Sequence, residues 1–165
     1  MRWKRAELAG AVYASLDVHP RERVLAWADD GAGRPVVATE TALHVQRVPP
    51  EYARFGWEQI ERASYEAGTL TVVLGESLGG ATLRVPVGPE RQLPVVVRDR
   101  ITASVVVDRF VALSGDSGAR IIGRRGPDGT VAWQVELDPA LDGDAAARAA
   151  SQVAFDEVRA EVGDL

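Results

Sequence analysis

Apolar and polar residues alternate along most of this chain with the two-residue period of a β-strand. The alternation predicts strands over 24–28, 36–39, 42–47, 81–87, 119–125 and 131–137. An apolar run of strand length covers 105–113. Groups of Gly, Asp, Ser and Pro separate these runs, and such groups are typical of turns. We therefore expect a protein built mainly of short antiparallel strands.

The stretch from Arg54 to Leu74 predicts a β-hairpin at the centre of the chain. Trp57 and Ile60 anchor its first strand, and Ala67-Gly68 forms a tight turn. After the turn the apolar residues alternate: Leu70, Val72 and Leu74. We expect Trp57 to lie in the core, as we do Trp133 further along the chain, because both alternate with apolar neighbours.

Three segments change to the period of a helix. The first is 1–18, where Leu8, Val12 and Leu16 form one stripe. The second is 89–103, with Leu93, Val97 and Ile101 four residues apart. The third is 142–162, with Asp142 or Asp144 as N-cap and Gly163 at the position of a C-terminal glycine.

The order of six strands and a helix resembles that of bacterial pleckstrin-homology-like domains. The segments that carry the resemblance are ERVLAWAD, VVATETALHV, FGWEQIERASYEAGTLTVVL and LRVPV. Those domains share an aromatic-x-x-Ile strand, here Trp57 to Ile60, followed by a hairpin and a closing helix. With VRDRITASVVV and the strand around Trp133 included, nearly the whole chain resembles an uncharacterised family of actinobacterial proteins.

This resemblance implies an α+β fold. Its core would be a pleckstrin-homology-like antiparallel β-barrel, partly open, or a bent two-sheet structure with a closing helix. An N-terminal helix (1–18), the core (19–103) and a β-β-β-α extension (104–165) would follow one another, as separate units or as one single domain. The resemblance implies no catalytic residues, and folds of this kind bind lipids, proteins and peptides alike.

Composition excludes several classes of protein. The 165 residues include no cysteine, so disulfides, thiolate zinc sites and cysteine nucleophiles are absent. A net charge of −5 argues against nucleic-acid binding, which depends on neutralising phosphates. No apolar run reaches the roughly 20 residues that a membrane-spanning helix needs. Glu7 interrupts the first apolar segment, so we expect a helix instead of a signal peptide and a cytoplasmic protein.

Gly115-Asp116-Ser117-Gly118 resembles the nucleophile loop of chymotrypsin-like serine proteases. His44 lies upstream, as the order His, Asp, Ser of that triad requires. However, Ala119-Arg120 follows where those proteases have Gly-Pro, and His44 lies within a predicted strand. Gly, Asp and Ser are also the residues that turns use. We therefore expect a turn here, with a hydrolase using Ser117 and His44 as the alternative.

We expect neither a metal nor a cofactor. His19 and His44 are the only histidines, and their separation does not match a ligand pair. The acidic residues Asp138, Asp142 and Asp144 lack the spacing of a calcium-binding loop, and we interpret them as turn and capping residues. The glycines form no phosphate-binding loop.

The candidate binding residues are three arginines, Arg120, Arg124 and Arg125. In a strand, Arg120 and Arg124 share one face, and arginine forks match carboxylates and phosphates. They predict a patch that binds an anion or a protein partner. The alternative is a solvated face on which the arginines pair with Glu136 and Asp128.

The function that we predict is a non-enzymatic binding or adaptor module. It would recognise a segment of another protein through an open sheet edge. One alternative is the hydrolase described above. Another is a peripheral membrane module that uses the N-terminal basic residues Arg2, Lys4 and Arg5. The oligomeric state is left open by the sequence.

Overall fold

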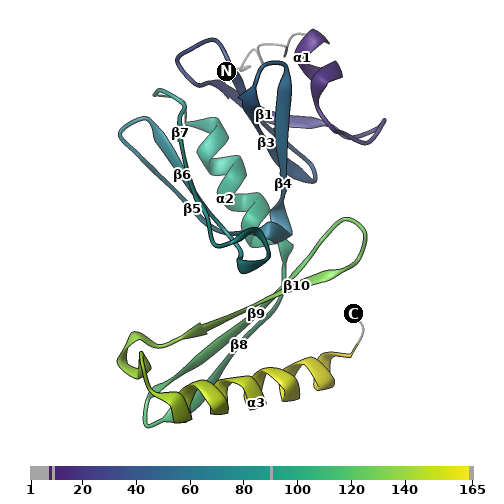
Figure 1. Ribbon diagram of the computed structural model, residues 1–165. Coiled ribbons are helices and arrows are strands. Elements are labelled where there is room, and N and C mark those ends of the chain that lie inside the picture. The colour runs from purple at the N-terminus through teal and green to yellow at the C-terminus, as the bar shows by residue number, and fades with distance from the viewer. Residues whose placement is uncertain (1–7, 9, 90, 164–165) are drawn as a thin grey trace, which may run out of the picture.

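The computed structural model describes residues 8, 10–89 and 91–163 (Figure 1). These residues form three antiparallel sheets. The first sheet contains β1 (Val24–Asp29), β2 (Pro35–Thr39), β3 (Ala42–Val48) and β4 (Glu51–Gly56) in that order. The second contains β5 (Ile60–Glu66), β6 (Thr69–Leu74) and β7 (Thr82–Pro86). The third, which we call the distal sheet, has the order β10-β9-β8, with β8 (Val105–Ser114), β9 (Ser117–Arg125) and β10 (Val131–Leu137).

Three α-helices and three short 3₁₀ turns join the strands in the described part of the chain. The helices are α1 (Gly10–Ser15), α2 (Gln92–Ser104) and α3 (Ala145–Val162). The 3₁₀ turns are η1 (Trp57–Gln59), η2 (Glu76–Leu78) and η3 (Pro139–Leu141). The predicted α+β class is thus confirmed. The strands that the structure describes do not close into a barrel, because each of the three sheets ends in unpaired edge strands.

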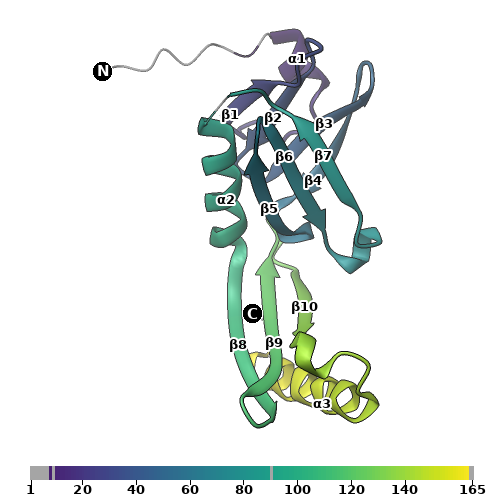
Figure 2. The ribbon, with the colours of Figure 1, turned by 90° about the vertical axis from the view of Figure 1, so that its left-hand side faces the viewer.

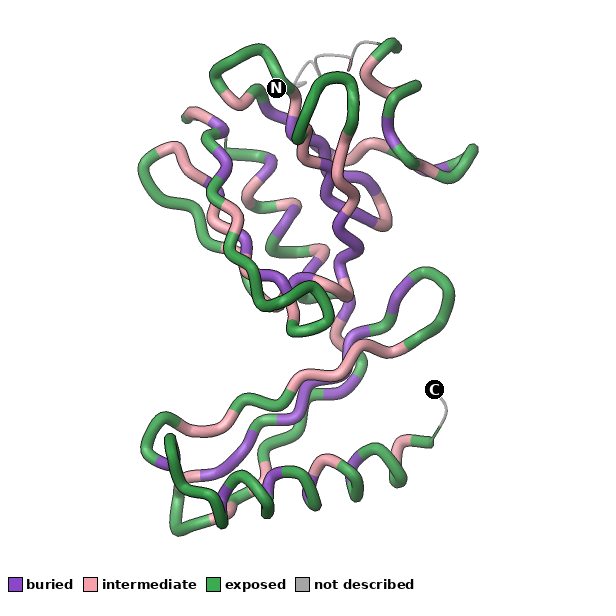
Figure 3. Tube along the Cα trace, in the orientation of Figure 1, coloured by how far each residue is buried: buried purple, intermediate pink, exposed green. Residues whose placement is uncertain are grey.

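The main core lies between the first two sheets and α2. Strand β6 shows how the sequence builds it, because its residues alternate between buried and half-buried positions, as the pattern predicted. Along α2, Leu93, Val97 and Ile101 are buried, which confirms the predicted helical stripe. The helix packs against β1, β2 and β5, and so contacts both sheets. Figure 3 shows buried positions along the strands of both sheets and along α2.

The first half of the central hairpin differs from the prediction. The aromatic-x-x-Ile segment is not a strand, because Trp57–Gln59 forms the 3₁₀ turn η1 between β4 and β5. The side chain of Gln59 stabilises this corner, since its Oε1 accepts a hydrogen bond from the backbone N–H of Gly56 at 2.9 Å. Trp57 and Ile60 are three residues apart, and the turn brings both into the core, where they are buried.

The second half of the hairpin is as predicted. Ala67 and Gly68 both have positive φ, 48° and 78°, as the two-residue type I′ turn requires. The hydroxyl of Tyr65 donates a hydrogen bond of 2.7 Å to the carbonyl of Gly88, which ties the hairpin to the end of β7. Strand β7 lies at the edge of its sheet, which suits Pro86 because proline cannot donate to a ladder.

The distal sheet and α3 form a second core cluster. It contains Val107, Ile121, Ala154 and Val158, and Trp133 and Phe155 pack against it. The rings of Trp133 and Phe155 meet edge to face, with their centroids 5.7 Å apart. Asp144 caps α3 by accepting hydrogen bonds from the N–H groups of Ala146 and Ala147, and Gly163 follows the helix with a φ of 65°. The predicted β-β-β-α arrangement of this region is confirmed. Figures 1 and 2 show α3 lying along one face of the sheet.

The predicted N-terminal helix is observed only from Gly10 to Ser15, and residues 1–7 and 9 lie outside the described residues. Leu16 at its end is buried, and Val12 is half-buried. The division of the chain into units at 18 and 103 stays a prediction.

Candidate functional site

Two of the three predicted arginines share a face of the distal sheet, and the third does not. Strand β9 places Arg120 and Arg124 on one side, whereas Arg125 is one residue further along and faces the other side. Arg120 and Arg125 are exposed, while Arg124 is buried. The structure therefore does not bring the three guanidinium groups together as one exposed patch.

Arg124 connects the distal sheet to the main core. Its Nη1 donates a hydrogen bond of 2.9 Å to the carbonyl of Ile101 and one of 3.3 Å to the hydroxyl of Ser104, both in the last turn of α2. Its Nη2 donates to the carbonyl of Glu61 in β5 at 2.9 Å. The last carbonyls of a helix lack partners within the helix, and a cation there is favourable. Arg124 thus caps a helix that ends 20 residues before it in the sequence.

The burial of Arg124 lowers the pKa of its guanidinium from the ordinary value, and the nearby carboxylates of Glu136 and Glu61 oppose this shift. The group keeps its charge at working pH. Because its Nη atoms are occupied by backbone and hydroxyl oxygens, Arg124 holds the fold together instead of presenting a free fork to an anion.

Replacing Arg124 by methionine is expected to lower the free energy of unfolding by about 2–3 kcal/mol, because the carbonyls of Ile101 and Glu61 and the hydroxyl of Ser104 each lose a hydrogen bond from a charged donor. Arg124→Lys should recover only part of the loss, since an ammonium group cannot reach both α2 and β5 as a planar fork does. Chemical denaturation followed by circular dichroism measures the free energy of unfolding of wild type and each variant. Arg125→Met, one residue away and exposed, is the matched control, and its stability should change by less than about 0.5 kcal/mol. Equal losses in the two variants would contradict the role given to Arg124.

Arg120 is paired with a residue that the sequence did not indicate. Its Nε and Nη2 donate to the two carboxylate oxygens of Asp108 in β8, at 2.7 and 2.6 Å. The hydrogen bond from Arg120 holds the pKa of Asp108 below its usual value. The partners expected on a solvated face, Glu136 and Asp128, instead accept hydrogen bonds from Gln134 and Thr130. Finding Asp108 required the register between β8 and β9, which sequence patterns do not give.

Ser117 and His44 are not brought together. Ser117 begins β9 directly after a two-residue turn at Gly115 and Asp116, so the expected turn is observed. His44 lies in β3 of the first sheet. Figure 2 shows the start of β9 at the far end of the distal sheet, away from β3. No hydrogen bond between the two side chains is therefore possible in this structure.

His44 is completely buried. Its Nε2 lies 3.4 Å from the hydroxyl of Thr39, and its Nδ1 has no hydrogen-bond partner among the described residues. Burial and, to a smaller extent, the charge of the neighbouring Arg54 lower the pKa of this imidazole to about 4, against the opposite effect of Glu22 and Asp17. His44 is therefore a neutral core residue.

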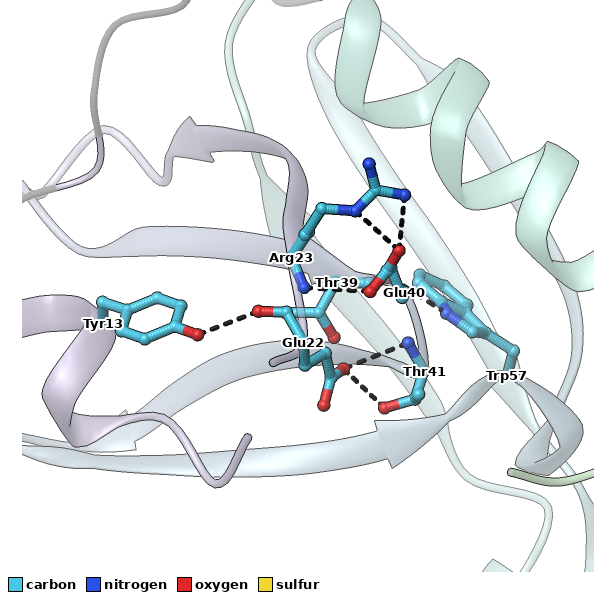
Figure 4. A network of polar contacts seen from close by, with 7 residues as sticks. All are labelled: Tyr13, Glu22, Arg23, Thr39, Glu40, Thr41 and Trp57. Carbon is cyan, nitrogen blue, oxygen red and sulfur yellow. Dashed lines mark hydrogen bonds and ion pairs between the residues drawn. The ribbon is translucent and has the colours of Figure 1, made fainter. Parts of the chain in front are cut away.

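A polar network beside His44 ties the N-terminal segment to the first sheet (Figure 4). Glu22 is buried, and its Oε1 accepts hydrogen bonds from the N–H and the hydroxyl of Thr41, at 3.1 and 2.5 Å. Burial raises the pKa of Glu22, but hydrogen bonds from Thr39, Thr41 and His19 outweigh it, so the pKa lies below the usual value. The hydroxyl of Tyr13 in α1 donates to the carbonyl of Glu22 at 2.8 Å. The network therefore has a structural role, because it links α1 and Glu22 to the first sheet.

The acidic residues near α3 act as caps. The carboxylate of Asp138 accepts a hydrogen bond from the N–H of Ala140, and that of Asp144 caps α3. Within residues 8, 10–89 and 91–163, no group of three or more acidic or histidine side chains is placed to hold a metal ion.

The longest edge strand of the described chain is β8, and its outer side faces away from β9. This strand is ten residues long, and among the described strands only β9 pairs with it. Two of its large apolar side chains are exposed, Val106 at 41% and Phe110 at 56%. We call residues 105–114, with this unpaired side, the β8 edge.

A shallow depression borders the β8 edge. It is lined by residues of β8 and by the last residue of α3: Val106, Val107, Asp108, Arg109 and Val162. A second shallow depression lies at the end of α3. Neither depression is lined by a nucleophile next to a base.

The basic residues of the membrane alternative, Arg2, Lys4 and Arg5, lie outside the described residues. Among the helices that the structure does describe, none combines the length and the apolar character needed to cross a bilayer.

No protein-family model matches this chain, and neither a curated protein nor a solved structure matches it significantly. The protein is therefore classed by its fold alone. It is an α+β protein with three antiparallel sheets, a buried polar network and a long open sheet edge.

Proposed function

We propose that this protein is a non-enzymatic binding module that captures an extended segment of a protein by adding it as a strand to the β8 edge. The observation that carries the proposal is the length of this edge together with the exposure of Phe110 and Val106. An unpaired strand offers a row of N–H and C=O groups, and natural proteins cover such edges unless they are used.

The other edge strands of the described chain, β1, β4, β5, β7 and β10, are all shorter than β8. Strand β7 is five residues long and contains Pro86. Strands β1 and β5 are in contact with α2. Strand β8 carries apolar side chains on both of its faces, so an added segment would gain side-chain contacts as well as backbone hydrogen bonds.

The arrangement of the first two sheets supports the proposal that residues 19–103 form a pleckstrin-homology-like core. A four-stranded and a three-stranded antiparallel sheet face each other and are followed by a helix that contacts both. In this proposal the core is a scaffold, and the distal sheet presents the binding edge. The cytoplasm remains the predicted location.

The test uses a phage-displayed library of random twelve-residue peptides selected on the wild-type protein. Recovered peptides are titrated by calorimetry into wild type, Val106→Lys and Phe110→Lys. We expect at least about ten-fold weaker binding to both variants, because a lysine on an edge opposes strand addition. Val153→Lys is the control, since Val153 is similarly exposed but lies on α3.

Bound peptide should also slow hydrogen exchange within residues 105–114. If no peptide is recovered, or if the recovered peptides bind the edge variants and wild type equally, the proposal is wrong.

A further inference from the structure

The β8 edge is regular only in its middle. The pairing with β9 shifts between Val105 and Val107 and again between Ala112 and Ser114. Between these two irregularities, residues 107–112 follow β9 in continuous register. Phe110 lies within this regular part, and its ring lies over Gly118 of β9, close to where a Cβ on that glycine would be. The ring therefore packs across β9 on one face of the sheet, where 56% of Phe110 stays exposed.

We propose that the segment captured by the β8 edge is the β8 edge of a second copy of this chain, in antiparallel register around Phe110. This inference rests on the proposed function of the edge and names its partner. A twofold axis perpendicular to the sheet would join the two distal sheets into one continuous sheet. Both α3 helices would then lie on the same face of that sheet.

The charged residues of β8 favour some registers between the two copies of the strand over others. Residues that lie opposite each other across a pair of strands share a face, so a twofold axis perpendicular to the sheet must pass through a residue paired with itself. An axis at Asp108 would place two carboxylates opposite each other, and an axis at Arg109 would place two guanidinium groups opposite each other, both of which are unfavourable.

An axis at Phe110 avoids these repulsions and keeps most of the strand paired. Phe110 then faces Phe110 of the second copy, Asp108 faces Ala112, and Arg109 faces Val111. Aromatic pairs across neighbouring strands are favourable. Arg109 keeps its ion pair with Glu161 of α3 in its own chain. Axes at Val107 or Val111 also separate the charges, but they pair a shorter part of the strand.

The depression at the β8 edge fits this register. With the axis at Phe110, Leu113 of the second copy lies opposite Val107, one of the residues that line the depression beside Val162. Leu113 is half-buried within its own chain and so has surface left to cover. Two copies of this contact, one on each side of the axis, would surround the central pair of phenylalanines.

The chain has no cysteine, so a single introduced cysteine can report the register. Cβ atoms of directly opposite residues are about 4.5–5.5 Å apart, near the range of a disulfide, whereas diagonal neighbours are about 7–8 Å apart. Under mild oxidation Phe110→Cys should form a covalent dimer, while Asp108→Cys and Ala112→Cys should do so at least about ten-fold more slowly when each is alone. A mixture of Asp108→Cys and Ala112→Cys retains Phe110 and should cross-link as a mixed dimer.

Sedimentation equilibrium of the unmodified chain supplies the second measurement. Wild type and Val153→Lys should show a reversible monomer–dimer equilibrium, and Phe110→Lys should remain monomeric. A wild type that is monomeric up to about millimolar concentration would overturn the proposed partner, as would cross-linking that is faster at Asp108 than at Phe110. Peptide binding at the edge would then still support the proposed function, whereas loss of both would reject the two proposals together.

Discussion

Replacing Trp57 by alanine is expected to lower the free energy of unfolding by about 3–5 kcal/mol, the usual cost of emptying a large buried aromatic site. Trp57 is only 4% exposed and lies in η1, where the chain passes from the first sheet to the second. Its indole Nε1 donates a hydrogen bond of 3.2 Å to the carbonyl of Thr39. Its backbone N–H donates to the carbonyl of Thr41 at 3.3 Å. The substitution would therefore open a cavity and also leave the Thr39 carbonyl without its donor.

Trp57→Phe separates these two contributions. Phenylalanine retains most of the apolar volume but cannot donate to Thr39, so we expect a smaller loss of about 1–2 kcal/mol. Chemical denaturation of the three proteins gives the comparison. A loss below about 1 kcal/mol for Trp57→Ala would mean that Trp57 does not belong to the core.

The stability of wild type should fall by about 2.5 kcal/mol between about pH 7.5 and pH 4.5 because of His44. Its pKa is lowered from 6.5 to about 4 in the folded protein by burial. The unfolded chain therefore takes up a proton on this residue at higher pH than the folded protein does. The stabilisation is complete above the unfolded pKa and is lost as the pH falls from 6.5 toward 4.

His44→Gln should remove this pH dependence. The carboxylates with lowered pKa, such as Glu22 and Asp108, lose their stabilisation mainly as the pH falls through their unfolded pKa values of 4.5 and 3.8, at the acid end of this window and below it, and they do so in both proteins. Glu61, whose pKa is raised by burial and by Glu136, contributes with the opposite sign. It is present in both proteins, so the difference between their pH profiles isolates His44.

The measurement is a set of urea titrations at several pH values, with His44→Leu as a second variant. The slope of stability against pH is compared, so a general loss of stability does not obscure the result. Equal slopes in wild type and both variants would show that His44 is not the titrating group.

The sequence predicted elements well where the pattern is local. The alternation of Leu70, Val72 and Leu74 and the helical spacing of Leu93, Val97 and Ile101 each specify one buried face, and all six residues are buried. The turn at Ala67-Gly68 was also predicted, because few sequences other than those with glycine adopt two positive φ angles. The segment around Trp57 was assigned wrongly to a strand, since an apolar pair three residues apart fits a strand end as well as a 3₁₀ turn.

The candidate site depended more on the tertiary structure. The sequence predicted binding through an open sheet edge, but it did not indicate which strand provides that edge. The strand order identifies β8 as an edge strand. Arg120 and Arg124 were correctly placed on one face by the strand period, but that period does not say what lies against the face. Arg120 meets Asp108 through the β8–β9 register, and Arg124 meets the end of α2.

The sequence by itself determined which residues turn toward a core, because burial follows strand and helix periods that extend over only a few residues. Only the tertiary structure decided which polar groups meet. Arg124 contacts carbonyls 23 and 63 residues earlier in the chain. Contacts over such separations depend on how whole sheets and helices pack, and the spacing of residues within one element carries no information about them.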